Sequence, residues 1–209
     1  MILYNDATSP FGRKVMIAAI ERGLPVTEEF VDLGAAEHID RFNPLRQIPV
    51  LVTAAGQGVY DSDTILHYFD ELGLVPPLVP PDRRVETLTR CSLANGLMEA
   101  TLTRLLETRK APESRSPAFI ELREARIARV VAALEGQCER FAGGPIAADQ
   151  ITVATALGYL DFRYSRDWRT GAPRLAAWYE TMAARPSFVE TAPERQAPAK
   201  TPTQRGGRG

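Results

Sequence analysis

The sequence predicts an α/β domain with a mixed sheet over residues 1–75, followed by an all-α domain over residues 84–190. In the first third of the chain, short apolar runs alternate with apolar residues at helical spacing, in the order βαβ followed by ββα. A Pro-rich linker over residues 76–83 comes next, and beyond it the apolar spacing is helical throughout. With 209 residues, 44% of them hydrophobic, the chain is long enough for two cores.

The elements of the first domain follow from apolar runs and from the residues that break them. A helix is expected to start with Ser9 as its N-cap and Pro10 as its first residue, and to end at Gly23. A second helix is expected over residues 62–72, with Gly73 after it. Strands are expected at residues 2–4, 26–31, 48–52 and 59–60, and a loop or short helix at 35–42.

The domain boundary is expected at four closely spaced prolines, which are Pro76, Pro77, Pro80 and Pro81. Proline cannot continue a helix and favours extended backbone. Downstream, helices are expected at residues 84–110, 117–141, 152–164 and 173–185. From Pro193 the chain is rich in Pro, Gly and Gln, and its charges after Glu194 are all basic. We therefore expect a flexible basic tail over residues 191–209.

Composition argues against several classes of function. The net charge of −1 gives no strong attraction to nucleic acid or to an anionic membrane. No apolar run approaches the roughly 18 residues of a membrane span, and the first residues do not resemble an export leader. Cys91 and Cys138 lie far apart, which is typical of a reduced, cytoplasmic protein, and we expect both to be buried small hydrophobes. His38 and His67 suggest no metal site.

Ser9 is the first candidate for chemistry. Helix capping by itself explains a serine before a proline at a helix start. A helix start also carries unpaired N–H groups and partial positive charge, so a hydroxyl there could stabilise a bound thiolate. Both interpretations remain open at this point.

Two further segments carry candidate residues. General frequencies favour a trans peptide bond between Ile48 and Pro49, because only about 5–6% of X–Pro bonds are cis. In the segment Tyr60-Asp61-Ser62-Asp63, Ser62 is expected to cap the next helix. The same helix start could hold a ligand carboxylate, with Asp61 pairing a ligand ammonium group, as an amino-acid head group would require.

Taken in order and spacing, these segments resemble the cytosolic glutathione transferases. The likeness covers about residues 1–190 and rests on SPFGRK, NPLRQIPVL, YDSDTILHYF, the Pro-rich linker, ITVATALGYLDF and RPSFVETAP. It is closest to small bacterial members with a Thr-Ser-Pro-Phe active-site segment, here Thr8 to Phe11. The resemblance implies a thioredoxin-like first domain, an all-helical second domain, glutathione as co-substrate without a metal, and a homodimer.

The resemblance also implies roles for individual residues. Ser9 would donate a hydrogen bond to the glutathione sulfur. The backbone of Ile48, ahead of a cis Pro49, would pair with the cysteinyl unit. Asp61 and Ser62 would hold the γ-glutamyl end, and Gln47 or Arg46 would meet the glycyl carboxylate. The electrophile would lie against Phe11, Arg109, Tyr159 and Phe162.

Two departures from the family pattern stand out in the sequence. Some relatives have cysteine where this chain has Ser9, so mixed-disulfide chemistry is not expected here. Thr155 stands where many relatives have the aspartate of a capping box, which we expect Thr152 to begin. The alternative to a transferase is a non-catalytic relative that uses the same fold to bind other proteins.

Overall fold

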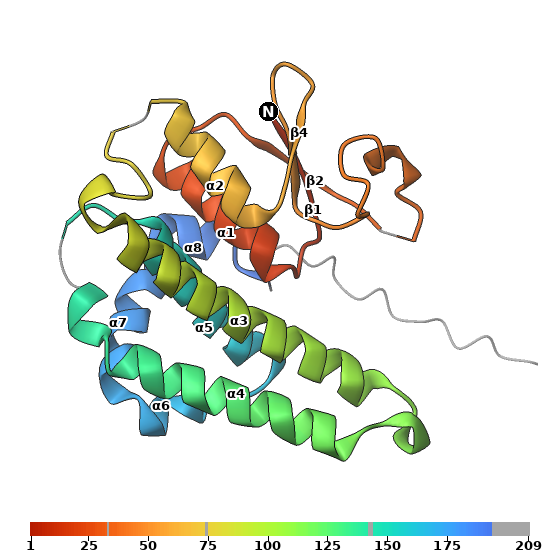
Figure 1. Cartoon of the computed structure of the whole chain (residues 1–209), viewed down its shortest axis with the longest axis vertical. Coiled ribbons are helices and arrows are strands. Elements are labelled where there is room, and N and C mark those ends of the chain that lie inside the picture. The colour runs from red at the N-terminus through yellow and green to blue at the C-terminus, as the bar shows by residue number, and fades with distance from the viewer. Residues whose placement is uncertain (33, 74, 142–143, 194–209) are drawn as a thin grey trace, which may run out of the picture.

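The first part of the molecule is a four-stranded mixed sheet with two helices on one face (Figure 1). The structure, a computed structural model, describes residues 1–32, 34–73, 75–141 and 144–193. The strands are β1 (Ile2–Asn5), β2 (Thr27–Phe30), β3 (Val50–Val52) and β4 (Gly58–Val59), in the spatial order β2-β1-β3-β4. The pair β1 and β2 is parallel, whereas β3 runs antiparallel to both of its neighbours.

The sheet is covered differently on its two faces because neighbouring side chains of a strand point in opposite directions. Leu3 packs toward the helices α1 (Pro10–Glu21) and α2 (Ser62–Glu71) in the main core of this part. The next residue, Tyr4, packs on the other face against Ile39, in a small cluster under the loop that follows β2. That loop contains the 3-10 turn Glu37–Ile39. The predicted fold class of the first domain is confirmed.

The second part is a bundle of helices packed beneath α1 and α2 in the view of Figure 1. Its helices are α3 (Arg84–Arg109), α4 (Pro117–Glu135), α5 (Ala148–Arg163), α6 (Trp168–Gly171), α7 (Pro173–Ala183) and α8 (Pro186–Glu190). Helix α5 lies in the middle and packs against both α3 and α1. Its residues from Ala148 to Leu160 are all buried, so this helix joins the two cores.

Two helix boundaries differ by more than two residues from those expected. Helix α4 ends at Glu135, and the remaining residues to 141 include a separate 3-10 turn, Cys138–Phe141. Helix α5 begins at Ala148, four residues before the expected start, so Thr152 lies inside it and does not begin a capping box. The Thr152 hydroxyl donates instead to the carbonyl of Ala148, at 2.6 Å. The true start is fixed by Gln150, whose side chain accepts from the Ala147 N–H at 2.8 Å.

The Pro-rich segment between the two parts is attached to both of them. The carboxylate of Asp70, in α2, accepts hydrogen bonds from the N–H groups of Leu78 at 2.6 Å and Val79 at 2.8 Å. The carbonyl of Leu78 accepts from the N–H of Ala148 at 2.8 Å. Residues 78 and 79 are buried, so this segment is part of the packed structure.

Two other expectations concern the end of the chain and membranes. Residues 194–209 of the expected basic tail lie outside the described residues. Among the helices that the structure describes, none combines the length and the apolar character needed to cross a membrane.

Candidate functional site

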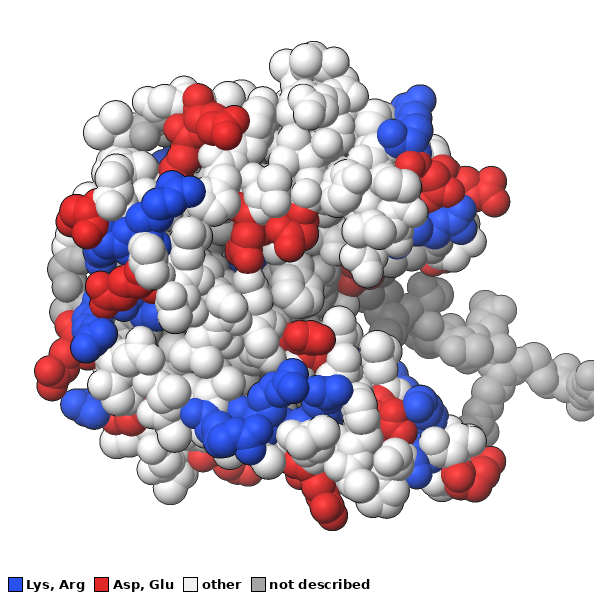
Figure 2. Space-filling model, viewed as in Figure 1, with Lys and Arg blue, Asp and Glu red and all other residues white. Residues whose placement is uncertain are grey.

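A cleft of about 1010 Å³ lies between the sheet part and the helical bundle. The space-filling surface is visibly drawn in between these two parts, on the right of the view (Figure 2). The sheet side supplies, among others, Ser9, Phe11, Gln47, Ile48, Pro49, Asp61 and Ser62. The helical side supplies Asn95, Leu102, Leu105, Leu106, Arg109, Tyr159 and Arg163.

Ser9 is the N-cap of α1, as the sequence predicts. Its side-chain oxygen accepts from the N–H of Gly12 at 3.4 Å, which is a long hydrogen bond, and Pro10 is the first helical residue. Among the described residues, the Ser9 hydroxyl has no acceptor of its own. The hydroxyl can therefore donate to a ligand in the cleft, at a helix end that carries partial positive charge.

Gly12 brings the start of α1 against the end of β1. A Cβ atom at this position would lie 1.7 Å from Oδ1 of the buried Asn5, so no larger residue fits without a shift. The Asn5 amide in turn donates to Glu28 of β2 at 2.8 Å, and burial raises the pKa of the Glu28 carboxyl. The absence of a side chain at Gly12 thus fixes where Ser9 stands relative to the sheet.

The loop before β3 brings backbone groups to the cleft. The Ile48–Pro49 peptide bond is cis. The isomer implied by the family resemblance is therefore correct, and the trans isomer favoured by the general frequency of X–Pro bonds is wrong. Buried Asn43 holds the loop, because its side chain donates to the carbonyl of Gln47 at 2.8 Å and accepts from Leu45 at 3.1 Å. Gln47 lines the cleft. Arg46 does not, since its guanidinium pairs with Asp40 on the exposed surface.

At the start of α2, the expected cap is wrong by one residue. Asp61 is the N-cap, and its Oδ1 accepts from the N–H groups of Asp63 at 3.1 Å and Thr64 at 3.2 Å. Ser62 is the first helical residue and is buried. Aspartate is as good an N-cap as serine, and local sequence did not separate two adjacent candidates. Both residues line the cleft.

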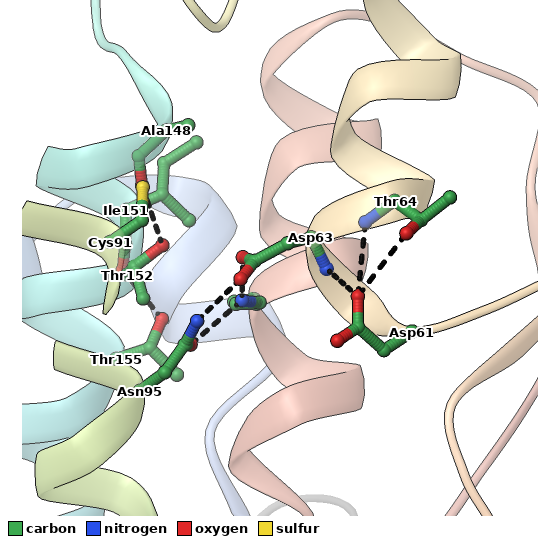
Figure 3. A network of polar contacts seen from close by, with 10 residues as sticks. Asp61, Asp63, Thr64, Cys91, Asn95, Ala148, Ile151, Thr152 and Thr155 are labelled. Atoms are coloured by element: carbon green, nitrogen blue, oxygen red, sulfur yellow. Dashed lines mark hydrogen bonds and ion pairs between the residues drawn. The ribbon is translucent and has the colours of Figure 1, made fainter. Parts of the chain in front are cut away.

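A buried polar network behind this helix start was missed by the sequence analysis. The Lys14 ammonium, which is fully buried, donates to Asp63 at 2.5 Å and to Asn95 at 2.9 Å. The Asn95 amide donates to the second oxygen of Asp63 at 2.5 Å. Figure 3 shows Asn95 reaching across from α3 to Asp63, beside the hydrogen bonds that Asp61 accepts from its own helix. This network ties α1, α2 and α3 together at the edge of the cleft.

The helical wall differs from the expected electrophile site at one position. Phe11, Arg109 and Tyr159 line the cleft, whereas Phe162 does not. Arg163 is found there instead, with its guanidinium 4.1 Å from the centre of the Phe162 ring. The spacing from Tyr159 to Arg163 is four residues, which puts both on one helix face and is the signal that could have found Arg163.

The family models decide the identity of this fold. Residues 8–72 match the glutathione S-transferase N-terminal domain, and residues 117–181 match the glutathione S-transferase C-terminal domain. The chain belongs to the glutathione S-transferase family. An uncharacterised GST-like protein of Escherichia coli (strain K12), YibF, is 31% identical over 93% of this chain and 100% of its own length.

Solved structures of members of this family have the same fold. One from Pseudomonas fluorescens Pf-5 with bound glutathione is 36% identical, with a TM-score of 0.87, over 92% of this chain and 98% of that chain. The same protein was also crystallised with S-(propanoic acid)-glutathione. A transferase from Methylobacillus flagellatus KT with bound glutathione is 32% identical, with a TM-score of 0.86 and coverage of 92% and 98%.

The cysteines of the chain do not line its cleft. Cys91 is buried in α3, and its sulfur lies 3.8 Å from the Thr152 hydroxyl oxygen. Burial raises the pKa of the Cys91 thiol to about 12, so it stays protonated and unreactive near neutral pH. Cys138 is only half-buried, in contrast to the expectation, and burial raises its pKa as well. Within the described ranges, no cluster of His, Cys, Asp and Glu could hold a metal ion.

Proposed function

We propose that this transferase binds glutathione in the cleft and activates its thiol, through Ser9, for attack on a small electrophile. The observation that carries the proposal is the hydroxyl of Ser9, without an acceptor of its own among the described residues and at the start of α1, in the cleft that also holds the start of α2. The two homologous transferases crystallised with bound glutathione support it. Because its co-substrate would be a reduced thiol, we also propose that the protein is cytoplasmic.

The remaining roles follow the shape of glutathione. The γ-glutamyl end, with its carboxylate and ammonium, would meet the Ser62 hydroxyl, the N–H groups of α2 and the Asp61 carboxylate. The backbone of Ile48, held by cis Pro49 just before β3, would pair with the cysteinyl unit as an added strand does. We assign the glycyl carboxylate to Gln47, because Arg46 is engaged with Asp40.

The energy required is modest. A free thiol has a pKa of about 8.5, and each unit of depression requires about 1.36 kcal/mol of preferential thiolate binding. A hydrogen bond to a charged group contributes about 1.5–3 kcal/mol, and the helix dipole adds a few tenths to about 1 kcal/mol. Ser9 and α1 together would lower the thiol pKa by one or two units.

Sulfur is the nucleophile in the proposed reaction. The thiolate uses one of its electron pairs to form a bond to the electrophilic carbon. A leaving group departs with the electron pair of the bond that breaks. If the substrate is an activated alkene instead, the displaced π pair is protonated on the neighbouring carbon.

The alternative hypothesis is a non-catalytic module that uses the glutathione transferase fold to bind another protein. It would predict no activation of the thiol, whether or not glutathione binds. We also expect a homodimer formed through the sheet part and the helices α3 and α4, and light scattering during gel filtration tests that assembly.

A pH series of thiolate ultraviolet absorbance tests the proposal. Glutathione is titrated alone, with the wild-type protein, with Ser9→Ala and with Thr8→Val. Thr8 is the matched control, because its hydroxyl lies in the same cleft but donates to Asp6 at 2.6 Å. We expect the bound thiol pKa to lie about one unit or more below that of free glutathione, to return toward it in Ser9→Ala and to stay lowered in Thr8→Val. Binding without any thiolate signal would favour the interaction module.

A further inference from the structure

Charge is divided between the two walls of the cleft. The carboxylates that line it, Asp6, Asp32 and Asp61, all belong to the sheet part. The arginines that line it are Arg109, the last residue of α3, and Arg163, the last residue of α5. The wall that would face the electrophile is therefore cationic.

Arg109 and Arg163 lack the ion-pair partners that nearby arginines have among the described residues. Arg104, five residues before Arg109, pairs with Glu124 at 2.7 Å, and Arg169 pairs with Asp161 at 2.6 Å. Among the described residues, neither Arg109 nor Arg163 has a carboxylate at ion-pair distance. The Nε of Arg163 is buried and has no hydrogen-bond acceptor in the part of the chain that the structure describes.

The helix dipoles explain only part of this arrangement. A cation in the last turn of a helix is favourable because the helix end carries partial negative charge. A guanidinium that pointed into solvent would satisfy the dipole of α3 or α5 equally well. Arg109, although exposed, and Arg163 both line the same cleft, which they reach from two different helices.

The surroundings of the two guanidiniums fit a ligand with an anionic end and an apolar body. Tyr159 is buried nearby and contacts Arg163, and burial raises the pKa of its phenol, so the hydroxyl stays protonated and able to donate. Leu102, Leu105 and Leu106 line the same wall along α3. Asp6 also lies near Tyr159, but its Oδ1 already accepts from the N–H of Thr8 at 2.8 Å and from the Thr8 hydroxyl at 2.6 Å.

We propose that the preferred electrophiles of this enzyme carry a carboxylate, which Arg109 and Arg163 bind while the apolar body lies along α3. The inference rests on the proposed function, since it takes the glutathione sulfur to stand near Ser9. The carboxylate is a recognition group and is not altered in the reaction. The two arginines determine specificity and take no part in thiol activation.

Matched pairs of glutathione conjugates test this carboxylate site by calorimetry. S-(carboxymethyl)glutathione is compared with S-(carbamoylmethyl)glutathione, and S-(4-carboxybenzyl)glutathione with S-(4-carbamoylbenzyl)glutathione. Each pair differs only by an acid in place of an amide, and the two pairs differ in reach. We expect the acid of at least one pair to bind about 10-fold more tightly than its amide, because a charge-assisted contact is much stronger than a neutral one.

The variants are Arg109→Gln, Arg163→Gln and their combination, with Arg166→Gln as the control at an exposed position that does not line the cleft. The combined variant should bind acid and amide equally, with its affinity for the amide changed less than about twofold, while Arg166→Gln keeps the preference. Arg163→Lys should retain part of the preference, because it keeps the charge.

Glutathione itself is titrated into every variant, so that the two proposals fail separately. If glutathione and the amides bind but neither acid is preferred, the carboxylate site is wrong and the proposed function stands. A preference that survives in the combined variant would also overturn the site. If neither glutathione nor any conjugate binds to the wild-type protein, the proposed function is wrong and the carboxylate site is wrong with it.

Discussion

The two walls of the cleft differ in the chemical groups that they present. The sheet wall presents helix starts and backbone, namely the capped ends of α1 and α2 and the loop before β3. The helical wall presents side chains, from α3 and the end of α5. The helix starts of the sheet wall add backbone N–H groups to the side chains of Ser9, Asp61 and Ser62. Under the proposed function, glutathione would bind at the first wall and the electrophile at the second.

Each wall also has its own buried ion pair behind it. On the sheet side, Lys14 reaches Asp63, whose side chain remains 35% exposed. On the helical side, Arg90 of α3 pairs with Asp149 of α5 at 2.5 Å, and both side chains are at most 2% exposed. The first pair supports the start of α2, and the second holds together the two helices that form the opposite wall. If the two walls act independently, substitutions in the Lys14–Asp63 pair and in the Arg90–Asp149 pair should differ in their effects on stability and on glutathione binding.

Asp149→Ala should have the largest effect, on stability alone. The substitution leaves the Arg90 guanidinium buried, with Glu86 as its remaining carboxylate at 2.5 Å. Removing one partner of a buried pair costs about 3–5 kcal/mol. Urea unfolding measures the loss. The control, Glu86→Ala, removes a carboxylate that is 43% exposed and should cost less than about 1 kcal/mol. A wild-type midpoint for Asp149→Ala would contradict the role given to this pair.

Asp63→Ala should cost less stability but should also weaken glutathione binding. It leaves Lys14 with only the Asn95 side chain as a partner among the described residues, and water can reach the position of Asp63, so we expect about 2 kcal/mol. The start of α2 that carries Asp61 and Ser62 also loses its tie to α1 and α3. Urea unfolding and glutathione calorimetry are measured on the same samples, below the unfolding transition.

The double variant Lys14→Met with Asp63→Ala removes both charges and should recover part of the lost stability. Asp149→Ala serves as the comparison for binding, because it should leave the glutathione affinity of the folded protein nearly unchanged. Equal losses of affinity in Asp63→Ala and Asp149→Ala would mean that the two walls are not independent.

Alanine substitutions at two glycines are expected to change stability in opposite directions, and the smallest effect is expected at Gly96. Gly12→Ala must displace the buried Asn5 side chain, and overpacking of this kind costs about 1–3 kcal/mol. Gly96 lies inside α3, and no described atom comes within 4 Å of the place that a Cβ would take there. Gly96→Ala should therefore stabilise the protein by about 0.5–1 kcal/mol. Thermal unfolding followed by circular dichroism measures both. If Gly12→Ala is neutral, Gly12 does not fix the position of α1.

Much of the sheet wall could be predicted because local chemistry specifies it. Ser9 and Pro10 define a helix start over two adjacent residues, and the structure has them in those positions. The same kind of reasoning named Ser62 as a cap where the structure has Asp61, a residue type that accepts the same N–H groups. The cis bond before Pro49 came from the family resemblance, because nothing local favours that isomer.

The sequence by itself determined the order of the elements in the first domain, the fold class and the start of α1 at Ser9 and Pro10, because these depend on neighbours within a few positions. Only the tertiary structure decided that Lys14, an apparently ordinary helix residue, is buried on Asp63 and Asn95. It also decided that Arg163, and not Phe162, lines the cleft. Such contacts join residues far apart in the chain. Which face of a helix makes a contact depends on how the helices pack, and a local sequence pattern does not specify that packing.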